Sequence, residues 1–219
     1  MKRFLIGACC AALVAAASQA TAQNLLDDGG FELATGNSST SNSNWVLTAD
    51  TPDGTNLSAQ FQDAPWASNP LGVAGIGLWF KAFEGQQATG DPAANATLEQ
   101  TVAAGPGTYN LSFYVRHETN FTADSASVVL SSDAGDVATF DLLATANDGA
   151  YNQYSINGFL ASAGTTSLTV QAVMVNGIDA QANPQSMMLD DFFLAVPEPG
   201  AVALAGLALA GVAAARRRR

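Results

Sequence analysis

Flat aromatic rings beside polar side chains are well suited to bind sugars, and the sequence carries such a set on two predicted strands. In residues 76–83, Trp79 and Lys81 alternate with apolar residues, so they share one face of an extended strand. Tyr114 and Arg116 point away from the apolar face of their own predicted strand. Together these four residues form a candidate glycan-binding face. The alternative, which we rank first, is packing, because both faces of a sandwich strand can be half-buried and Trp most often packs.

Other aromatic residues and the single histidine are weaker candidates for chemistry. Trp45, Trp66 and Tyr151 lie in predicted loops, and His117 falls on the apolar face of its strand, where packing is the expected role. The sequence has no Gly-x-Ser-x-Gly turn, no His-Glu-x-x-His zinc motif and no phosphate-binding loop. Paired carboxylates can hydrolyse glycosides, but in so acidic a chain their presence is not informative. We therefore expect no enzyme, with glycoside hydrolysis as a distant alternative.

The charge of the chain excludes one class of partner. All of its 19 acidic residues except Glu198 lie between the two terminal segments, where the only basic residues are Lys81 and Arg116. Phosphate contacts need clustered Lys and Arg, so nucleic-acid binding is excluded. An acidic surface favours solubility outside the cell and attracts divalent cations.

The region between the terminal segments, residues 23–195, reads as strands and turns. Residues 108–118 alternate, with Tyr109, Leu111, Phe113 and Val115 on one face. Gly, Asn, Asp and Pro separate the segments at short intervals, which predicts an all-β domain, a β-sandwich of the jelly-roll type. The further predicted strands are residues 76–83, 128–130, 137–143, 154–160, 168–175 and 187–194.

Short motifs at the two ends of this domain carry a family resemblance. The domain opens with Gly29-Gly30-Phe31-Glu32 and closes with Asp190-Asp191-Phe192. This pair resembles the galactose-binding-like jelly rolls found among carbohydrate-binding modules. The resemblance implies that the two segments lie together and hold a structural calcium ion, with Glu32 and Asp190 or Asp191 as ligands. Calcium takes oxygen ligands, and backbone carbonyl oxygens can complete its coordination shell. The alternative is that these are solvated carboxylates at strand ends.

The first 22 residues have the pattern of a secretory signal peptide. A positive start, Met1-Lys2-Arg3, precedes an apolar run, and Ala20-Thr21-Ala22 offers small residues for signal peptidase. Cleavage after Ala22 would leave Gln23 as the mature N-terminus. Both cysteines, Cys9 and Cys10, lie in the removed segment, so a mature disulfide or thiol site is excluded.

The last segment, residues 196–219, has three parts in a fixed order. A proline pair cannot continue a strand or helix, the uncharged run 201–215 can form an apolar helix, and a basic cluster favours the cytoplasmic side of a membrane. The run is short of the roughly 20 residues that span a bilayer, and the basic side chains can compensate by reaching for the surface. The residues concerned are Pro197, Glu198 and Pro199, followed after the apolar run by Arg216, Arg217, Arg218 and Arg219.

This tripartite tail resembles the PEP-CTERM sorting signal of Gram-negative bacteria. The resemblance implies processing by an exosortase, a membrane-embedded cysteine transpeptidase, after transient anchoring of the chain in the inner membrane. We expect an exported cell-surface or extracellular-matrix protein that associates with exopolysaccharide and binds glycans. The alternative is a purely structural surface protein with no small ligand.

Overall fold

The structure is a computed structural model and describes residues 23–35, 39–63, 75–88 and 90–196. Residues 24–195 form one compact unit. The predicted signal peptide, the predicted helix 201–215 and the predicted sorting residues 197–199 and 216–219 lie outside the described residues. No helix among the described residues is long and apolar enough to cross a membrane.

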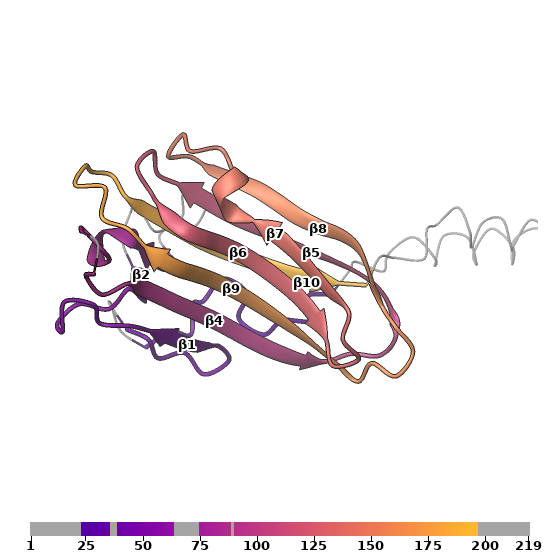
Figure 1. Cartoon of the computed structure of the whole chain (residues 1–219). Coiled ribbons are helices and arrows are strands. Elements are labelled where there is room, and N and C mark those ends of the chain that lie inside the picture. Colours follow the sequence, from indigo (N-terminus) through magenta and orange to yellow (C-terminus); the bar gives the residue numbers. More distant parts are fainter. Residues whose placement is uncertain (1–22, 36–38, 64–74, 89, 197–219) are drawn as a thin grey trace, which may run out of the picture. The chain divides into compact units, whose positions relative to one another are not determined.

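The unit is a sandwich of two antiparallel five-stranded sheets (Figure 1). One sheet has the strand order β1-β4-β9-β6-β7 and the other has the order β2-β3-β10-β5-β8. The chain changes sheet at most of its connections, as in a jelly roll. The all-β fold predicted from the sequence is therefore confirmed. The strands are β1 (Val46–Ala49), β2 (Ala59–Asp63), β3 (Ile76–Lys81), β4 (Ala94–Ala103), β5 (Gly107–His117), β6 (Ala123–Ser132), β7 (Val137–Asp141), β8 (Tyr151–Ala161), β9 (Ser167–Gly177) and β10 (Ser186–Ala195).

Two predicted strands end earlier than expected because 3-10 turns take over their last residues. The predicted strand 76–83 stops at Lys81, and Phe83 lies in the turn η1 (Ala82–Glu84). The predicted strand 137–143 stops at Asp141, whose side chain accepts a hydrogen bond from the Leu143 N–H and so caps η2 (Leu142–Ala144). Alternation alone does not reveal such a cap.

The core lies between the sheets and follows the period of two that the sequence shows. On β5, Leu111, Phe113 and Val115 are buried, while the residues between them face outward. An aromatic group fills the middle of the core: Phe31 lies 5.3 Å from Trp45 and 5.8 Å from Phe192, ring centre to ring centre. Trp45 lies just before β1, outside the strands, as expected, but it is buried in the core, which corrects its place among the candidates for sugar binding.

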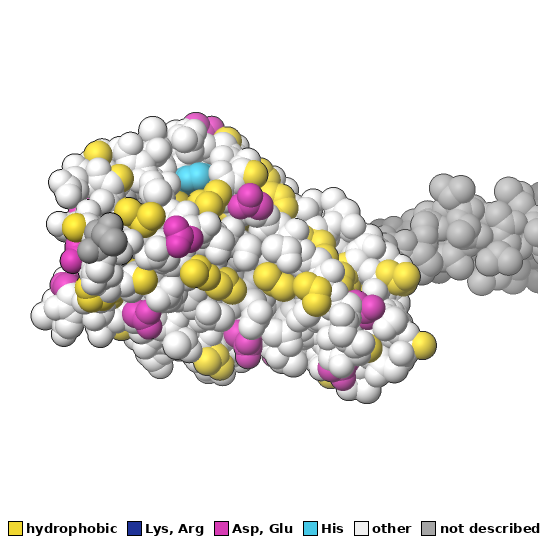
Figure 2. Space-filling model, in the orientation of Figure 1, with side chains coloured by type: hydrophobic (Ala, Val, Ile, Leu, Met, Phe, Trp, Pro, Cys, Tyr) yellow, Lys and Arg dark blue, Asp and Glu magenta, His cyan; other side chains and the backbone are white. Residues whose placement is uncertain are grey.

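The outer face of the β1-β4-β9-β6-β7 sheet carries acidic side chains and lacks basic ones among the described residues (Figure 2). Figure 2 shows the side covered by β1, β4, β9, β6 and β7, with acidic side chains scattered among apolar ones, a histidine, and no Lys or Arg among the described residues in view. Both basic residues of the described part, Lys81 and Arg116, belong to strands of the opposite sheet. Any site that uses them must lie on that sheet.

Candidate functional site

The outer face of the β2-β3-β10-β5-β8 sheet gathers the candidate sugar-binding residues. Cross-strand pairing places Gln60, Trp79, Met188, Arg116 and Tyr151 in one row across all five strands. The row therefore joins two residues predicted for this role with Tyr151, which lies on β8 rather than in a loop.

Within this row the aromatic residues pack on one another. Met188 is fully buried although it lies on the outer side of the sheet, and Trp79 and Tyr151 pack against it. Phe83 adds a further contact, with its ring centre 5.6 Å from that of Trp79. The packing interpretation of Trp79 is thus the one that its contacts support.

Each of the two basic side chains already has an acidic partner. Lys81 is buried, with its Nζ 3.6 Å from Glu84 Oε1 and 5.3 Å from the centre of the Trp79 ring. Burial lowers the pKa of Lys81, and the charge of Glu84 opposes that change. Arg116 donates from Nε to the Gly149 carbonyl and from one terminal nitrogen to Glu118 Oε1, at 2.8 and 2.7 Å. These contacts make both residues part of the sheet's own structure.

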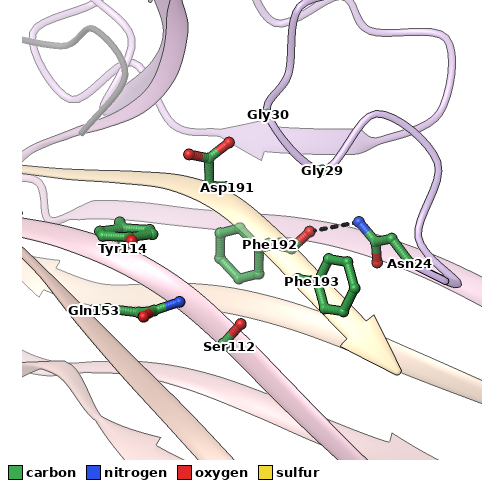
Figure 3. Close-up of a pocket in the computed structure, with 9 residues that line it drawn as sticks. All are labelled: Asn24, Gly29, Gly30, Ser112, Tyr114, Gln153, Asp191, Phe192 and Phe193. Carbon is green, nitrogen blue, oxygen red and sulfur yellow. Dashed lines mark hydrogen bonds between the residues drawn. The ribbon is translucent and has the colours of Figure 1, made fainter. Parts of the chain in front are cut away.

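A pocket of about 390 Å³ lies beside this row, over β10, β5 and β8 (Figure 3). Tyr114 stands opposite Gln153 on the neighbouring strand, and Ser112 lies two residues before Tyr114 on β5. In Figure 3 Tyr114, Gln153 and Ser112 line one side, while Asp191 and Phe193 of β10 line the other. The pocket thus combines aromatic surface with hydrogen-bonding groups from three strands. Its lining residues are Asn24, Gly29, Gly30, Ser112, Tyr114, Gln153, Asp191, Phe192 and Phe193.

A β-bulge in β10 gives the pocket its shape. The pairing of β10 with β5 shifts by one residue between Asp190 and Phe193, and Asp191 has a φ of 50°, in the left-handed region. The extra residue lets Phe192 point into the core, where it stacks on Phe113 at 5.4 Å, while Phe193 turns outward. Bulges commonly redirect side chains next to functional sites. Here the bulge delivers Asp191 and Phe193 to the pocket.

A further wall of the pocket is formed by the N-terminal strap, residues 24–34, through Asn24, Gly29 and Gly30. Asn24 Nδ2 donates to the Phe192 carbonyl at 2.9 Å, and its Oδ1 accepts from the Leu194 N–H at 2.9 Å. The Phe192 N–H donates to the Gly29 carbonyl at 2.9 Å. The strap passes so close that a Cβ on Gly29 would lie 2.0 Å from the Phe192 oxygen, so only glycine fits there.

The strap also bends sharply beside the acidic residues. Asp28 and Phe31 have φ values of 53° and 60°. Strained residues of this kind tend to gather at functional sites. The turn is held by Asp28, whose carbonyl accepts from Trp45 Nε1 at 2.9 Å and whose Oδ2 accepts from the Leu33 N–H.

Asp190, next to the pocket residue Asp191, has a strongly raised pKa. It is 1% exposed; its Oδ1 accepts from the Asp191 N–H, and its Oδ2 has no hydrogen-bond partner among the described residues. Burial, and after it the charges of Asp191, Glu32 and Asp28, raise the pKa of Asp190 to about 8. The Tyr151 hydroxyl is also buried without a described partner, and burial raises its pKa.

The predicted calcium ligands are therefore close enough together that the charges of Asp191 and Glu32 raise the pKa of Asp190. Glu32 uses one carboxylate oxygen to accept from the Ile76 N–H at 3.1 Å, at the start of β3. The described residues contain no group of three His, Cys, Asp or Glu side chains that could hold a metal ion. A calcium ion there would need backbone carbonyls for much of its shell, so calcium stays a prediction.

The remaining sequence candidates lie elsewhere. His117 is buried in the sandwich, with its Nδ1 2.9 Å from Thr145 Oγ1 and its ring edge-on to Phe121, so it packs as expected. Burial lowers its pKa. Trp66 lies outside the described residues.

Several lining residues were not foreseen from the sequence. Gln153 lies on β8 just before the predicted strand 154–160, so the alternation in that range did not include it. Ser112 occupies an outward position of β5 and could have been found by the same alternation that identified Tyr114. Phe193 could not, because the bulge reverses the face on which it lies. Asn24 could not either, because its role depends on the return of β10 to the start of the chain.

Comparison with known proteins adds the identity of the tail. Residues 195–219 match the family described as "PEP-CTERM protein-sorting motif". This motif implies an exported protein that is transiently anchored in the membrane of a Gram-negative bacterium and processed by an exosortase. No curated protein matches the chain.

Solved structures share the sandwich. The carbohydrate-binding module TmCBM61, solved with beta-1,4-galactotriose, is 17% identical, with a TM-score of 0.52 over 80% of this chain and 99% of that one. A cyclase from Fischerella sp. TAU is 12% identical, with a TM-score of 0.55 over 80% and 96% of the two chains. The active domain of bacteriophage CBA120 tailspike protein 4 is 12% identical, with a TM-score of 0.51; the match covers 80% of this chain and 21% of that one. At these identities the likeness establishes the β-sandwich fold.

Proposed function

We propose that this exported protein binds glycans, and that the pocket over β10, β5 and β8 is the binding site. The observation that carries the proposal is the lining of the pocket, where Tyr114 and Phe193 provide aromatic surface beside Ser112, Gln153 and Asp191. Concave sites with aromatic walls and a few convergent polar groups are the usual form of small-ligand sites. Sugars suit such a lining because their C–H faces lie on aromatic rings while their hydroxyls take up the polar groups.

The row beside the pocket supports this assignment as a scaffold. Trp79, Met188 and Tyr151 fix the outer face of the sheet by packing, and Arg116 is tied to Glu118 and Gly149. Of the four residues predicted from the sequence, Tyr114 is therefore the one that we assign to direct sugar contact. We assign Trp79, Lys81 and Arg116 to holding the face in shape.

A binding experiment can test the site directly. The first probe is beta-1,4-galactotriose, the sugar bound by TmCBM61, followed by an array of bacterial and plant polysaccharides. For a glycan that binds, Tyr114→Ala should weaken binding by roughly tenfold or more, about 1.4 kcal/mol. Thr139→Ala, an exposed change on the opposite sheet, is the matched control and should bind like the wild type.

The same array separates the alternatives. A purely structural surface protein would bind none of the glycans, and its pocket variants would behave like the wild type. A glycoside hydrolase would release shorter sugars from one of the polysaccharides, which chromatography of the reaction mixture would detect. Either result would replace glycan binding as the function.

We further propose that the processed protein works at the cell surface or in the matrix, in association with exopolysaccharide. The PEP-CTERM match supports this because it implies export and processing. In a host with an exosortase, replacing Pro197, Glu198 and Pro199 by alanine should leave an uncleaved, membrane-retained form, and deleting residues 196–219 should release soluble protein. If both variants fractionate like the wild type, the tail does not direct sorting in this protein. N-terminal sequencing of the exported form should give Gln23, the product of signal peptidase.

We also propose one structural calcium ion held through Asp190, with backbone carbonyls completing its shell. Its Oδ2 is buried without a described partner, and the nearby charges of Asp191, Glu32 and Asp28 would all be relieved by a cation. When bound, the ion would neutralise this cluster and join the strap to β10. A ligand that binds only the folded state stabilises it by about 2.7 kcal/mol at a hundredfold excess over Kd.

Thermal unfolding in calcium and in chelator tests the ion. Calcium should raise the Tm by several degrees, at about 2–4 °C per kcal/mol for a domain of this size. Magnesium should do less, because it prefers octahedral geometry and holds its water tightly. Glu32→Ala and Asp190→Asn should remove the calcium-dependent part. Equal Tm values in calcium and in chelator would contradict the ion, as would an equal effect of sodium at matched ionic strength.

A further inference from the structure

The two ends of the folded unit are hydrogen-bonded to each other through the strap. The Leu25 N–H donates to the Leu194 carbonyl at 2.7 Å, and the Leu194 N–H donates to Asn24 Oδ1 at 2.9 Å. Both backbone groups of Leu194 are therefore held by residues at the start of the chain. Leu194 is the penultimate residue of β10.

Asn24 is the centre of this arrangement. Its side chain makes hydrogen bonds to Phe192, to Leu194 and, within the strap, to the Leu26 N–H at 3.1 Å. The strap is in turn anchored on the opposite sheet, because Gln100 of β4 exchanges two hydrogen bonds of 2.8 Å with the backbone of Asp27. The end of β10 is thus tied to both sheets.

The consequence appears in the burial of the last residues. Leu194 is fully buried and Ala195 is 6% exposed, whereas Val196 is 51% exposed. The match to the sorting motif begins at residue 195. The change from buried to exposed chain therefore falls at the start of the motif.

We propose that the strap sets the inner limit of C-terminal processing. By keeping β10 closed through Ala195, it leaves Val196 as the first residue that an enzyme acting on the tail can take hold of. Proteolytic enzymes act on locally open chain, so a segment whose backbone groups are paired and buried must open before it can be cut. The processed protein would then keep a complete β10 and an intact pocket, because Asp191, Phe192 and Phe193 lie inside this limit.

The test weakens the link between the strap and β10 by removing its side-chain hydrogen bonds, and then follows the end of the chain. The full-length protein is digested from its C-terminus with a mixture of carboxypeptidases, and the intact mass of the product is measured over time. Digestion of the wild type should stop before it reaches Ala195, so that the product still ends at Val196 or at a residue C-terminal to it. Asn24→Ala removes the side-chain bonds to Phe192 and Leu194, so its digestion should continue into β10 and give products that end between residues 190 and 195.

Two further variants keep the result interpretable. Asn157→Ala is the matched control, because Asn157 is exposed on β8 and its side chain bonds only locally to Ser155 in the described structure; it should stop where the wild type stops. If Asn24→Ala does not fold, Asn24→Asp keeps the acceptor for Leu194 and loses the donor to Phe192, and it should give an intermediate degree of trimming. An Asn24→Ala product that ends at the same residue as the wild type would overturn the proposal. So would wild-type digestion that runs into β10.

Discussion

The raised pKa of Asp190 makes the stability of the fold depend on pH. An ordinary aspartate has a pKa of 3.8, whereas burial and the surrounding acids bring Asp190 to about 8. Between these two values the folded chain keeps a proton that the unfolded chain releases. Stability is therefore greatest below the unfolded pKa and falls as the pH rises through this window.

A substitution can isolate that effect. Asp190→Asn cannot ionise, so in chelator its Tm should gain on that of the wild type as the pH rises from about 4 to about 8. Thermal unfolding at several pH values measures the difference. In calcium the wild type should lose this decline, because a bound cation favours the carboxylate. A wild type and variant whose Tm values run parallel across this range would show that Asp190 does not hold the proton.

Gly29 lies so close to β10 that a larger residue there should destabilise the domain. In Gly29→Ala the new methyl group would lie 2.0 Å from the Phe192 carbonyl oxygen, so the strap or β10 must move. Overpacking of this kind costs about 1–3 kcal/mol, which corresponds to a fall in Tm of roughly 2–4 °C per kcal/mol. Gly105→Ala is the control, because a Cβ there meets nothing within 4 Å. Equal Tm values for the two variants would contradict the close approach.

Among the elements, the strap contributes more than its lack of regular structure suggests. Phe31 packs into the aromatic core, and Gln100 links the strap to β4 and, through a bond of 3.1 Å, to the Asn44 carbonyl. Gln100 is a buried polar residue with three polar partners on two segments of chain. Removing such a residue leaves its partners without hydrogen bonds.

Gln100→Leu tests the strap as an element. The side chain keeps its approximate size but loses all three hydrogen bonds, so we expect a cost of about 2 kcal/mol or more. Denaturant unfolding measures it, and the pocket should lose ligand affinity in parallel because the strap forms one wall. Gln153→Leu, an exposed glutamine on β8, should leave the free energy of unfolding nearly unchanged; because Gln153 lines the pocket, it is a control for stability alone. A silent Gln100→Leu would mean that the strap is held by packing alone.

Comparison of the predicted strands with the observed ones shows which parts of the fold and of the candidate site the sequence predicts. Alternation identified β5 and the face on which Tyr114 and Arg116 lie, because that strand has one apolar side. It missed β1, β2 and β4 as strands, since polar and small residues occupy many of their positions; Gln60 and Gln62 of β2 are buried although polar. It could not give the bulge in β10 or the strap, which depend on contacts between residues some 170 positions apart.

For the whole molecule, charge is the dominant feature. Nearly all of the chain's 19 acidic residues lie in the sandwich, and Lys81 and Arg116 are each paired with a glutamate. A strong excess of one sign destabilises the compact state through self-repulsion. Salt screens such repulsion, with a Debye length that falls from about 30 Å at 0.01 M to about 8 Å at 0.15 M.

Sodium chloride should therefore stabilise the domain even without a specific site. The Tm should rise as sodium chloride increases from about 0.01 to about 0.15 M, whereas binding of a neutral oligosaccharide should hardly change. Thermal unfolding and calorimetry over this range measure the two effects. A Tm that is flat or falls with salt would show that the acidic residues do not repel one another strongly enough to matter.

The place of the pocket on β10 has a mechanical consequence. Phe193 lines the pocket, and the chain leaves the sandwich at Val196, just after the end of the same strand. If a glycan held in the pocket is pulled while the protein is anchored through its C-terminal end, the force passes between these two points along the end of β10. The load is carried by the strap and by the ladder that β10 forms with β5. Most of the sandwich lies outside this path, so such a pull would load mainly the end of β10 and its direct neighbours.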